Sequence, residues 1–245
     1  MGYCIIIPAR YASTRFPGKP LADIGGKTMI RRVWDCAMQC TDAEAVLVAT
    51  DDQQILDHVN EFGRAVLTSS EHPSGTDRCR EAYATAGLTS DIVVNIQGDE
   101  PFIQAAQVQA LVDIFRDEKA EIATLKKSIS LDSEIDNPNV VKVVCDVHGR
   151  ALYFSRSRIP YNREIQANTR YFRHLGMYAY RADALKKITE LPPSVLEETE
   201  KLEQLRWLEN GYHIAVAETQ WQSPAVDTPE DLEKAIEFMK RIETV

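Results

Sequence analysis

The chain lacks both a long hydrophobic run and an excess of positive charge. No apolar stretch approaches the roughly 18 residues that a membrane-spanning helix needs. The 28 Lys and Arg residues are outnumbered by 37 Asp and Glu residues, which leaves a net charge of -9. A broad interface with nucleic acid is therefore not expected. The first residues carry no basic segment or cleavage site typical of a secretory signal. We expect a cytoplasmic protein that binds no nucleic acid and does not insert into a membrane.

Several familiar motifs are also missing. The five cysteines form an odd, scattered set, and the pair Cys36 and Cys40 has no second pair with which to hold zinc. Reduced, buried thiols are the simplest interpretation. Neither the G-x-x-x-x-G-K-[ST] loop nor a G-x-G-x-x-G run after the first strand occurs. These absences argue against the ordinary kinase and dehydrogenase classes.

The first half alternates short apolar runs with helical patterns. At 245 residues and 44% hydrophobic content the chain can bury a sizeable core. Alternation of strand and helix predicts an α/β fold with a mostly parallel central sheet flanked by helices. The predicted strands cover residues 4–7, 45–50, 65–67 and 92–96, and the predicted helices cover residues 28–40, 51–62, 78–86 and 102–116.

The second half is richer in strands. We predict strands over residues 122–126, 140–145, 151–154 and 170–180, and helices over residues 181–189 and 194–210. Thr228 is the expected N-cap of a last helix that has Pro229 at its first position. This pattern predicts a mixed-sheet subdomain with the second-substrate site and the subunit contact. No convincing linker occurs, so we predict one domain over residues 1–245, with halves at about 1–120 and 121–245.

Three cations follow the first strand. Pro8 cannot donate a ladder hydrogen bond, so the chain must leave the sheet there. Arg10, Arg15 and Lys19 then lie in a loop at the carboxyl end of the strand, where open α/β sheets bind ligands. A Pro-Gly turn at Gly18 lets backbone N–H groups approach a polyanion. We favour a nucleoside triphosphate site over the alternative of a solvated basic loop.

Two acidic positions are candidates for a metal site. Asp99 follows the strand at residues 92–96 and stands between Gly98 and Glu100. A carboxylate placed there suits Mg²⁺ held against phosphate oxygens, although an N-capping Asp gives the same pattern. Glu100 is interpreted as complementing the helix dipole. Asp227 is a lone Asp before the Thr228 cap, and an Asp in that position is most often structural.

Five runs of residues resemble the sugar nucleotidyltransferases, in the same order and across nearly the whole chain. Within that group they look like the cytidylyltransferases that activate the acid sugar 3-deoxy-manno-octulosonate (KDO). One departure is Arg158, where that family often has Pro, which puts only the local loop shape in doubt. The runs are Ile7-Pro8-Ala9-Arg10-Tyr11, Ser74-Gly75-Thr76-Asp77-Arg78, residues 95–101, residues 151–157 and residues 226–232.

The resemblance implies a Rossmann-like nucleotidyltransferase fold, CTP and KDO as substrates, Mg²⁺ as cofactor, a role in lipopolysaccharide or capsule synthesis, and a homodimer. It implies that Lys19, Arg15, Asp99 and Asp227 are catalytic and that Asp99 and Asp227 bind the metal. The nucleotide-binding residues it implies are Pro8, Ala9, Arg10, Arg15, Lys19, Ser74, Gly75, Asp77, Arg78 and Gln97. The sugar-binding residues it implies are Arg156, His174, Tyr178, Glu203 and Gln204.

Alternatives remain for these assignments. Thr76 and Asp77 are equally a helix cap, and Arg156 could pair with a surface acid. His174 and Tyr178 could be packing residues on a strand, while Glu203 and Gln204 could be the wet face of a helix. A cytidylyltransferase for another acid sugar such as sialic acid, a uridylyl or guanylyl enzyme on a sugar phosphate, and a non-catalytic nucleotide-binding protein are the competing functions.

Overall fold

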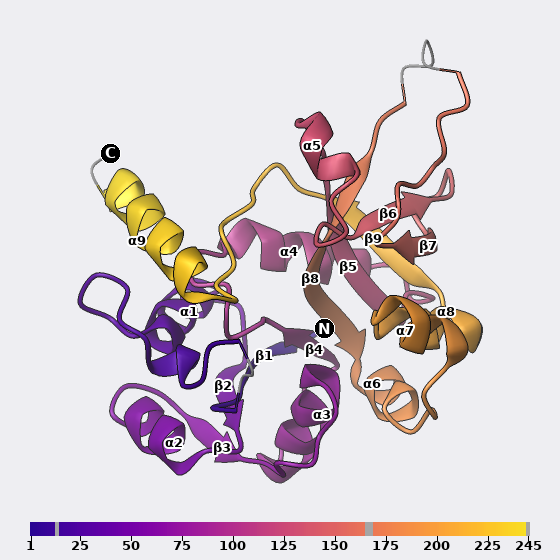
Figure 1. The fold of residues 1–245 in the computed structure, drawn as a ribbon. Coiled ribbons are helices and arrows are strands. Elements are labelled where there is room, and N and C mark those ends of the chain that lie inside the picture. Colours follow the sequence, from indigo (N-terminus) through magenta and orange to yellow (C-terminus); the bar gives the residue numbers. More distant parts are fainter. Residues whose placement is uncertain (13–14, 165–168, 244–245) are drawn as a thin grey trace. The chain divides into compact units, whose positions relative to one another are not determined.

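A computed structural model describes residues 1–12, 15–164 and 169–243 of the chain (Figure 1). The chain divides into two compact units. The first contains residues 1–109 and 222–245, and the second contains residues 110–221. Residues 222–245, which the sequence analysis places in the second half, therefore pack in the first unit. The expectation of a single domain stays a prediction.

The first unit is built on a parallel sheet. Its strands are β1 (Tyr3–Ala9), β2 (Ala45–Thr50), β3 (Ala65–Leu67) and β4 (Ile92–Asn95), in the order β3-β2-β1-β4. Every residue of β1 and β4 is buried, as expected for a sheet with both faces covered. The predicted parallel α/β architecture is confirmed.

Side-chain caps set where several helices of this unit begin. The Thr28 hydroxyl accepts the Arg31 N–H at the start of α1 (Met29–Ala37), and Asp52 caps α2 (Gln53–Asn60) in the same way. Ser74 caps α3 (Gly75–Thr85). Helix α4 (Ala105–Ile114) begins three residues later than predicted and crosses the boundary between the units, and a short 3-10 helix, η1, covers Lys19–Leu21.

The last helix, α9 (Pro229–Glu243), joins the first unit through an apolar cluster. Ala235 and Met239 on this helix pack with Ile24, Met29 and Phe102. Burial of this apolar surface fixes the end of the chain beside the loops that follow β1 and β4. The predicted start of the helix is confirmed, because the Thr228 hydroxyl accepts the Asp231 N–H at 3.3 Å.

The second unit contains a mixed sheet. Strand β5 (Ile122–Ser128) runs antiparallel to β8 (Phe172–Arg181) and parallel to β9 (Ile214–Glu218). Strands β6 (Lys142–Cys145) and β7 (Ala151–Ser155) form an antiparallel pair joined to β8. The predicted mixed sheet is confirmed. Strand β9 was not predicted, because five residues of weak alternation gave no clear signal beside the preceding helix.

The helices of this unit are α5 (Asp132–Ile135), α6 (Ala182–Ile188), α7 (Val195–Glu200) and α8 (Gln204–Glu209). The prediction of one helix over residues 194–210 is wrong. Lys201 adopts a left-handed conformation with φ of 53°, which ends α7. A buried ion pair of 2.5 Å between Arg206 and Glu197 then joins α8 to α7.

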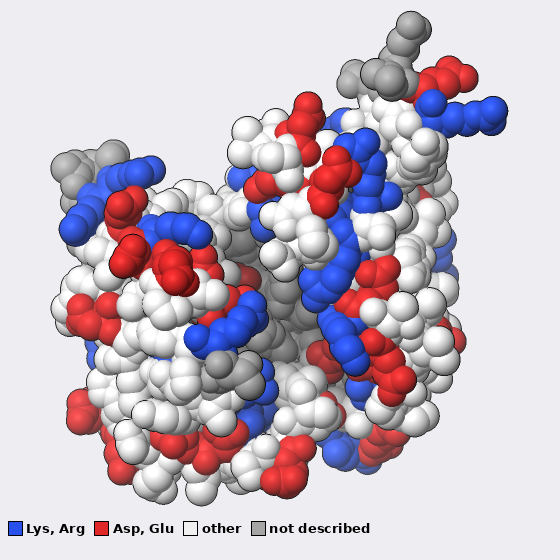
Figure 2. Space-filling model, viewed as in Figure 1, with Lys and Arg blue, Asp and Glu red and all other residues white. Residues whose placement is uncertain are grey.

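Charges of both signs are mixed on the face drawn in Figure 2, where Asp and Glu lie among Lys and Arg over both units. Partly exposed ion pairs, such as Arg31 with Asp35 at 2.7 Å in the first unit, also join charges of opposite sign. Within the described residues, no helix is both long and apolar enough to cross a membrane. All five cysteines are free thiols, and burial raises the pKa of the Cys4 thiol to about 11.

Candidate active site

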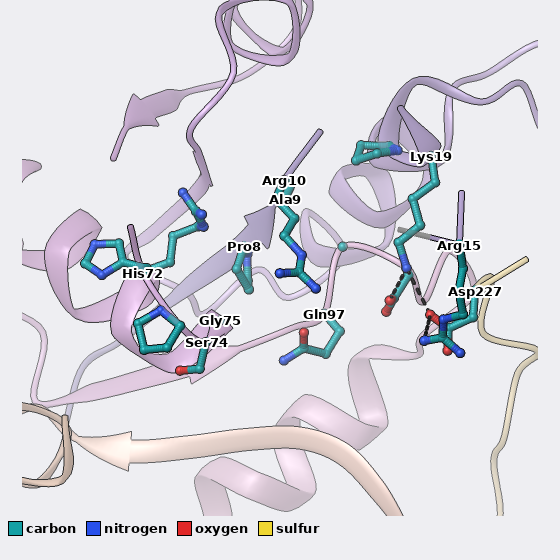
Figure 3. Close-up of a pocket in the computed structure, with 15 residues that line it drawn as sticks. Pro8, Ala9, Arg10, Arg15, Lys19, His72, Ser74, Gly75, Gln97 and Asp227 are labelled. Atoms are coloured by element: carbon teal, nitrogen blue, oxygen red, sulfur yellow. Dashed lines mark hydrogen bonds and ion pairs between the residues drawn. The ribbon is translucent and has the colours of Figure 1, made fainter. Parts of the chain in front are cut away.

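A cavity of about 310 Å³ opens in the first unit where β1 and β4 end (Figure 3). The end of a parallel strand is the expected place for a ligand in an open α/β sheet. Figure 3 shows Lys19, Arg15 and Asp227 at one end of the cavity and His72, Ser74 and Gly75 at the other. The described lining residues are Pro8, Ala9, Arg10, Arg15, Lys19, Pro20, His72, Pro73, Ser74, Gly75, Arg78, Gln97, Gly98, Asp99 and Asp227.

Two glycines permit the close backbone packing of this site. A Cβ on Gly98 would lie 2.7 Å from the carbonyl oxygen of Pro8, so only glycine fits between the loops that follow β1 and β4. Gly18 has φ of 71° and its N–H donates to the Tyr11 carbonyl at 2.9 Å. This left-handed residue directs the chain into η1, on which Lys19 stands.

Lys19 lies at the centre of a cluster of charges. Its Nζ donates to Asp99 Oδ2 at 2.6 Å, to Asp227 Oδ1 at 3.2 Å and to the Val226 carbonyl at 3.1 Å. The Val226 N–H donates to the Asp99 carbonyl at 2.9 Å, which ties together the two backbone segments that carry the carboxylates. Arg15 Nη2 lies 3.1 Å from Asp227 Oδ1. The fold thus brings all four predicted catalytic residues together.

The cations of the site differ in exposure. The Lys19 side chain is 13% exposed, whereas that of Arg15 is 64% exposed. Arg10 is also exposed and lines the cavity. Low exposure strengthens the electrostatic effect of the Lys19 ammonium, because water screens it less. The arrangement suits a polyanion bound by one partly shielded cation and two solvent-facing cations.

The chemistry of Asp99 and Asp227 fits Mg²⁺. Both carboxylates lie within hydrogen-bonding distance of the same ammonium, so their oxygens point toward one place. The described residues contain no group of three or more His, Cys, Asp or Glu that could hold a metal ion. Two carboxylates still suffice for Mg²⁺, which is commonly bound by one or two of them together with substrate phosphates and water.

The opposite end of the cavity is formed by the start of α3. Gly75 lies against Pro8 and the Gln97 amide oxygen, and the Gln97 Nε2 donates to Asn95 Oδ1 at 3.2 Å. These groups offer hydrogen-bond donors and acceptors in a confined space. Backbone and amide groups of this kind can pair with the edge of a nucleobase.

Two residues of the predicted nucleotide site have structural partners. The Asp77 N–H donates to the hydroxyl of the N-cap Ser74 at 3.2 Å, and the Asp77 carboxylate accepts that hydroxyl at 2.6 Å. Asp77 is not among the described residues that line the cavity. Arg78 is buried, and its Nη2 donates to Asp51 Oδ2 at 2.7 Å. Its Nη1 donates to the Thr68 hydroxyl at 2.6 Å and to the Ser69 carbonyl at 3.2 Å, so Arg78 anchors the loop before α3. Its nucleotide-binding role stays a prediction.

Sequence reasoning missed four lining residues: Pro20, His72, Pro73 and Gly98. His72 was the one with chemistry to offer, and its place just before the Ser74 cap was the available signal. Its Nε2 is bonded to the Glu81 carboxylate. Burial would raise the pKa of Glu81, but hydrogen bonds from the Ser69 N–H and from His72 outweigh it and lower that pKa.

In the second unit, Arg156 is held by carbonyl oxygens. Its Nε donates to the Glu200 carbonyl at 2.7 Å, and Nη1 donates to the Pro138 carbonyl at 3.0 Å. The Glu200 carboxylate accepts the Arg156 backbone N–H at 3.0 Å. No ion pair joins the guanidinium to a carboxylate of the described residues. The alternative that Arg156 pairs with a surface acid is therefore not supported.

His174 and Tyr178 belong to an aromatic cluster on β8. His174 Nε2 lies 2.9 Å from the Thr124 hydroxyl, and the ring contacts Phe154 and Tyr178 at centroid distances of 4.9 and 5.4 Å. Burial lowers the pKa of His174 to about 3. Burial, with a smaller effect from Glu203, raises the pKa of Tyr178 well above its usual value. Both side chains are therefore neutral at physiological pH.

Gln204 is 4% exposed, and its Nε2 has no hydrogen-bond partner among the described residues. A buried amide donor without a partner is costly, and such a group is often found where a ligand binds. The alternative that Gln204 lies on the wet face of a helix is wrong, because the residue is buried. Glu203 is half-buried and close enough to affect Tyr178.

Comparisons with known proteins place the chain in one family. The family model described as cytidylyltransferase matches residues 4–217. The chain is 51% identical to a 3-deoxy-manno-octulosonate cytidylyltransferase of Parabacteroides distasonis, with 98% of each chain covered. It is 48% identical to a protein of the same name from Thermodesulfovibrio yellowstonii, over 94% of this chain and 95% of the other.

Solved structures of nucleotidyltransferases also superpose on the chain. A CMP:2-keto-3-deoxy-manno-octonic acid synthetase complexed with CTP superposes with a TM-score of 0.94 at 43% identity, covering 99% of this chain and 100% of that one. A glucose-1-phosphate thymidylyltransferase of Bacillus anthracis superposes with a TM-score of 0.66 at 18% identity, covering 97% and 95%. The second likeness extends only to the Rossmann-like nucleotidyltransferase fold.

Proposed function

The chain belongs to the cytidylyltransferase family, and on that premise we propose that it transfers CMP from CTP to KDO, giving CMP-KDO and pyrophosphate. Such a product is the activated acid sugar used in lipopolysaccharide synthesis. The observation that carries the proposal is the cavity in which Lys19, Asp99 and Asp227 meet within hydrogen-bonding distance. The high identity to KDO cytidylyltransferases over the whole chain supports the choice of sugar.

The shape of the cavity supports an extended nucleotide. Its cationic end, with Lys19 and Arg15, suits the triphosphate, and its other end, near Ser74 and Gly75, suits the cytosine ring (Figure 3). The solved synthetase in complex with CTP, to which the chain is similar, also supports this assignment. Arg78 is paired with Asp51, and the other lining cations, Arg10, Arg15 and Lys19, exceed the two lining carboxylates by one charge. The site can therefore balance part of the charge of a triphosphate.

The proposed reaction is a direct displacement at phosphorus. The anomeric hydroxyl of KDO attacks the α-phosphorus of CTP, the new P–O bond forms, the bond to the β-phosphate breaks, and pyrophosphate leaves with the displaced electron pair. The hydroxyl loses its proton during this step. Charge builds on the phosphate oxygens, so catalysis depends on positioning and on charge neutralisation rather than on a covalent intermediate.

The residues of the site match these requirements. Lys19 is close to both carboxylates and mostly shielded from water, so its ammonium can stabilise charge that develops on the phosphates. Arg15 and Arg10 grip the outer phosphates from the solvent side. Asp99 and Asp227 would hold Mg²⁺, which supplies further neutralisation of phosphate charge. Asp227 is also a candidate to accept the hydroxyl proton.

The sugar site is proposed to lie in the second unit. Arg156 offers a planar fork that can pair with the KDO carboxylate. Tyr178, Glu203 and the unpartnered amide of Gln204 can bond sugar hydroxyls. His174, held neutral by burial, can serve as a packing surface or as a neutral hydrogen-bonding group.

We also propose a homodimer that acts in the cytoplasm. Strand β7 pairs with β6 alone among the described strands, and its Leu152 side chain is 62% exposed. An open strand edge with an exposed apolar residue suits a subunit contact. A reaction that consumes CTP suits the cytoplasm. Light scattering coupled to gel filtration measures the subunit number, and a monomer at micromolar concentration would contradict the dimer.

Pyrophosphate release tests the function directly. With CTP and Mg²⁺, we expect turnover with KDO and much weaker turnover with sialic acid or with a sugar 1-phosphate. Replacing CTP by UTP or GTP should lower the rate. Turnover with a sugar 1-phosphate but not with KDO would overturn the proposal, and a protein that binds CTP without turning over any sugar would favour the non-catalytic alternative.

The variant Asp99→Asn tests the catalytic role of the carboxylate. We expect kcat to fall by about 10²-fold or more, because the carboxylate that would hold the metal at the reacting centre loses its charge. Binding of CTP should remain. Asp42→Asn removes an exposed carboxylate of the same unit and is the matched control. Calorimetric titration of CTP separates binding from turnover. Wild-type activity in Asp99→Asn would refute the metal assignment.

A further inference from the structure

Lys142 is a fully buried lysine that no step above uses. Its relative exposure is 0%, although it stands on the short strand β6 in the second unit. A buried ammonium is costly unless its donors are satisfied. Here Nζ donates to the carbonyls of Val140 at 2.7 Å, Asn137 at 3.0 Å and Arg156 at 2.5 Å. No carboxylate of the described residues forms an ion pair with it.

These three carbonyls belong to two segments: the turn at residues 137–140, which contacts the Arg156 side chain, and the backbone of Arg156 itself. Asn137 and Val140 bracket a turn, and the Pro138 carbonyl within that turn accepts the Arg156 Nη1 at 3.0 Å. The third acceptor is the carbonyl of Arg156 itself. One buried ammonium therefore fixes the backbone of Arg156 and also the turn that orients its guanidinium.

The rest of the support comes from the end of α7. The Glu200 carboxylate accepts the Ser155 hydroxyl at 2.6 Å and the Arg156 N–H at 3.0 Å, and the Glu200 carbonyl accepts Arg156 Nε at 2.7 Å. Burial lowers the pKa of Lys142, with Asp136 and Glu200 opposing that effect and Arg156 adding to it. The Arg156 guanidinium donates to neutral carbonyls and not to a carboxylate of the described residues, so its positive charge remains available to an anion.

We propose that Lys142 is a positioning residue that sets the guanidinium of Arg156 for the carboxylate of the acid sugar. This inference rests on the proposed function, since it takes the sugar carboxylate as the anion that Arg156 binds. Without the ammonium, three buried carbonyls lose their donor and the turn at Pro138 shifts. A misplaced fork weakens binding of a planar carboxylate, because both of its hydrogen bonds depend on alignment.

The test is steady-state kinetics on Lys142→Met, which keeps the length of the side chain and removes its charge. We expect the KM for KDO to rise about tenfold or more, with kcat and the KM for CTP within about twofold of wild type. Arg156→Met should raise the KM for KDO further. The double variant should resemble Arg156→Met alone, because removing Lys142 matters only while the guanidinium is present.

Val143→Ala is the matched control. Val143 is 1% exposed and adjacent on the same strand, so its loss lowers stability without touching the carbonyls around Arg156. Its KM for KDO should equal that of wild type. If Lys142→Met does not fold, as judged by its melting temperature, Lys142→Arg replaces it, because a planar fork cannot meet the same three carbonyls.

The outcomes are separable. An unchanged KM for KDO in the folded Lys142 variant overturns the inference, as do independent, additive effects of the Lys142 and Arg156 substitutions. A tenfold rise that Val143→Ala also shows overturns it, since general loss of stability would then explain the effect. Wild-type protein that turns over another sugar but not KDO overturns the proposed function first, before any variant is compared.

Discussion

The buried imidazole of His174 should make the protein lose stability as the pH falls. Its ring lies against Phe154 and Tyr178 and bonds the Thr124 hydroxyl, all neutral groups, and burial lowers its pKa to about 3. An exposed histidine of the unfolded chain has a pKa near 6.5. Between these two values the unfolded chain binds a proton that the folded protein does not. The free energy of unfolding therefore falls as the pH is lowered through this window.

The size of the effect follows from the two pKa values. Each pH unit inside the window costs about 1.4 kcal/mol, so lowering the pH from about 7 to about 5 should cost about 2 kcal/mol from this one residue. Urea denaturation of the wild type and of His174→Gln at both pH values measures it. Gln keeps a hydrogen-bonding group near Thr124 but has no proton to gain.

The comparison uses the difference between the two proteins. Carboxyls with lowered pKa, such as Glu81 and Asp231, also lose their stabilising contribution as the pH falls, but they do so equally in both proteins. The wild type should therefore lose about 2 kcal/mol more than His174→Gln. Equal losses would refute the conclusion that the fold holds this imidazole neutral.

Two further predictions concern the cavity of the first unit. Gly98→Ala places a Cβ 2.7 Å from the Pro8 carbonyl oxygen, so we expect about 1–3 kcal/mol of destabilisation and weaker CTP binding by calorimetry, and an unaltered protein would contradict the close approach. Arg78→Met leaves the largely shielded Asp51 without its partner and should destabilise by about 3–5 kcal/mol in urea denaturation. In the double variant with Asp51→Asn most of that loss should be recovered, and no recovery would show that the ion pair is not the cause.

Local patterns in the sequence determined most elements of the fold. The apolar run before Pro8 and the run at Ala45–Thr50 predicted strands, and the structure places β1 and β2 there. The prediction that the chain leaves the sheet at Pro8 is wrong, because β1 continues through Pro8 and Ala9, in register with the end of β2. Thr28 capped its helix as expected, because capping depends on residues within one turn. The prediction of one helix over residues 194–210 was wrong, because no local signal indicated that Lys201 would take a left-handed conformation and end α7.

The candidate site also has residues that local patterns predicted and residues that only tertiary packing brought together. The sequence alone indicated cations after β1 and a carboxylate after β4, because strand ends and turn residues are local signals. No local signal indicated that Asp227 joins them, and only the resemblance to sugar nucleotidyltransferases implied it. Lys19 and Asp99 are 80 positions apart, and they meet at 2.6 Å because β1 pairs with β4. Lys19 and Asp227 are 208 positions apart, and packing of α9 against the first unit brings them within 3.2 Å.

Burial was likewise decided only by the tertiary structure. Lys142 stands in a predicted strand, and the resemblance implies that Arg78 binds the nucleotide. In the structure Lys142 is wholly buried among carbonyls, and Arg78 is paired with Asp51. The exposure of a long cationic side chain depends on which distant segments cover it. The sequence therefore determined which charged and polar side chains the protein has. The packing of distant segments determined which of them line the cavity and which are buried against other groups.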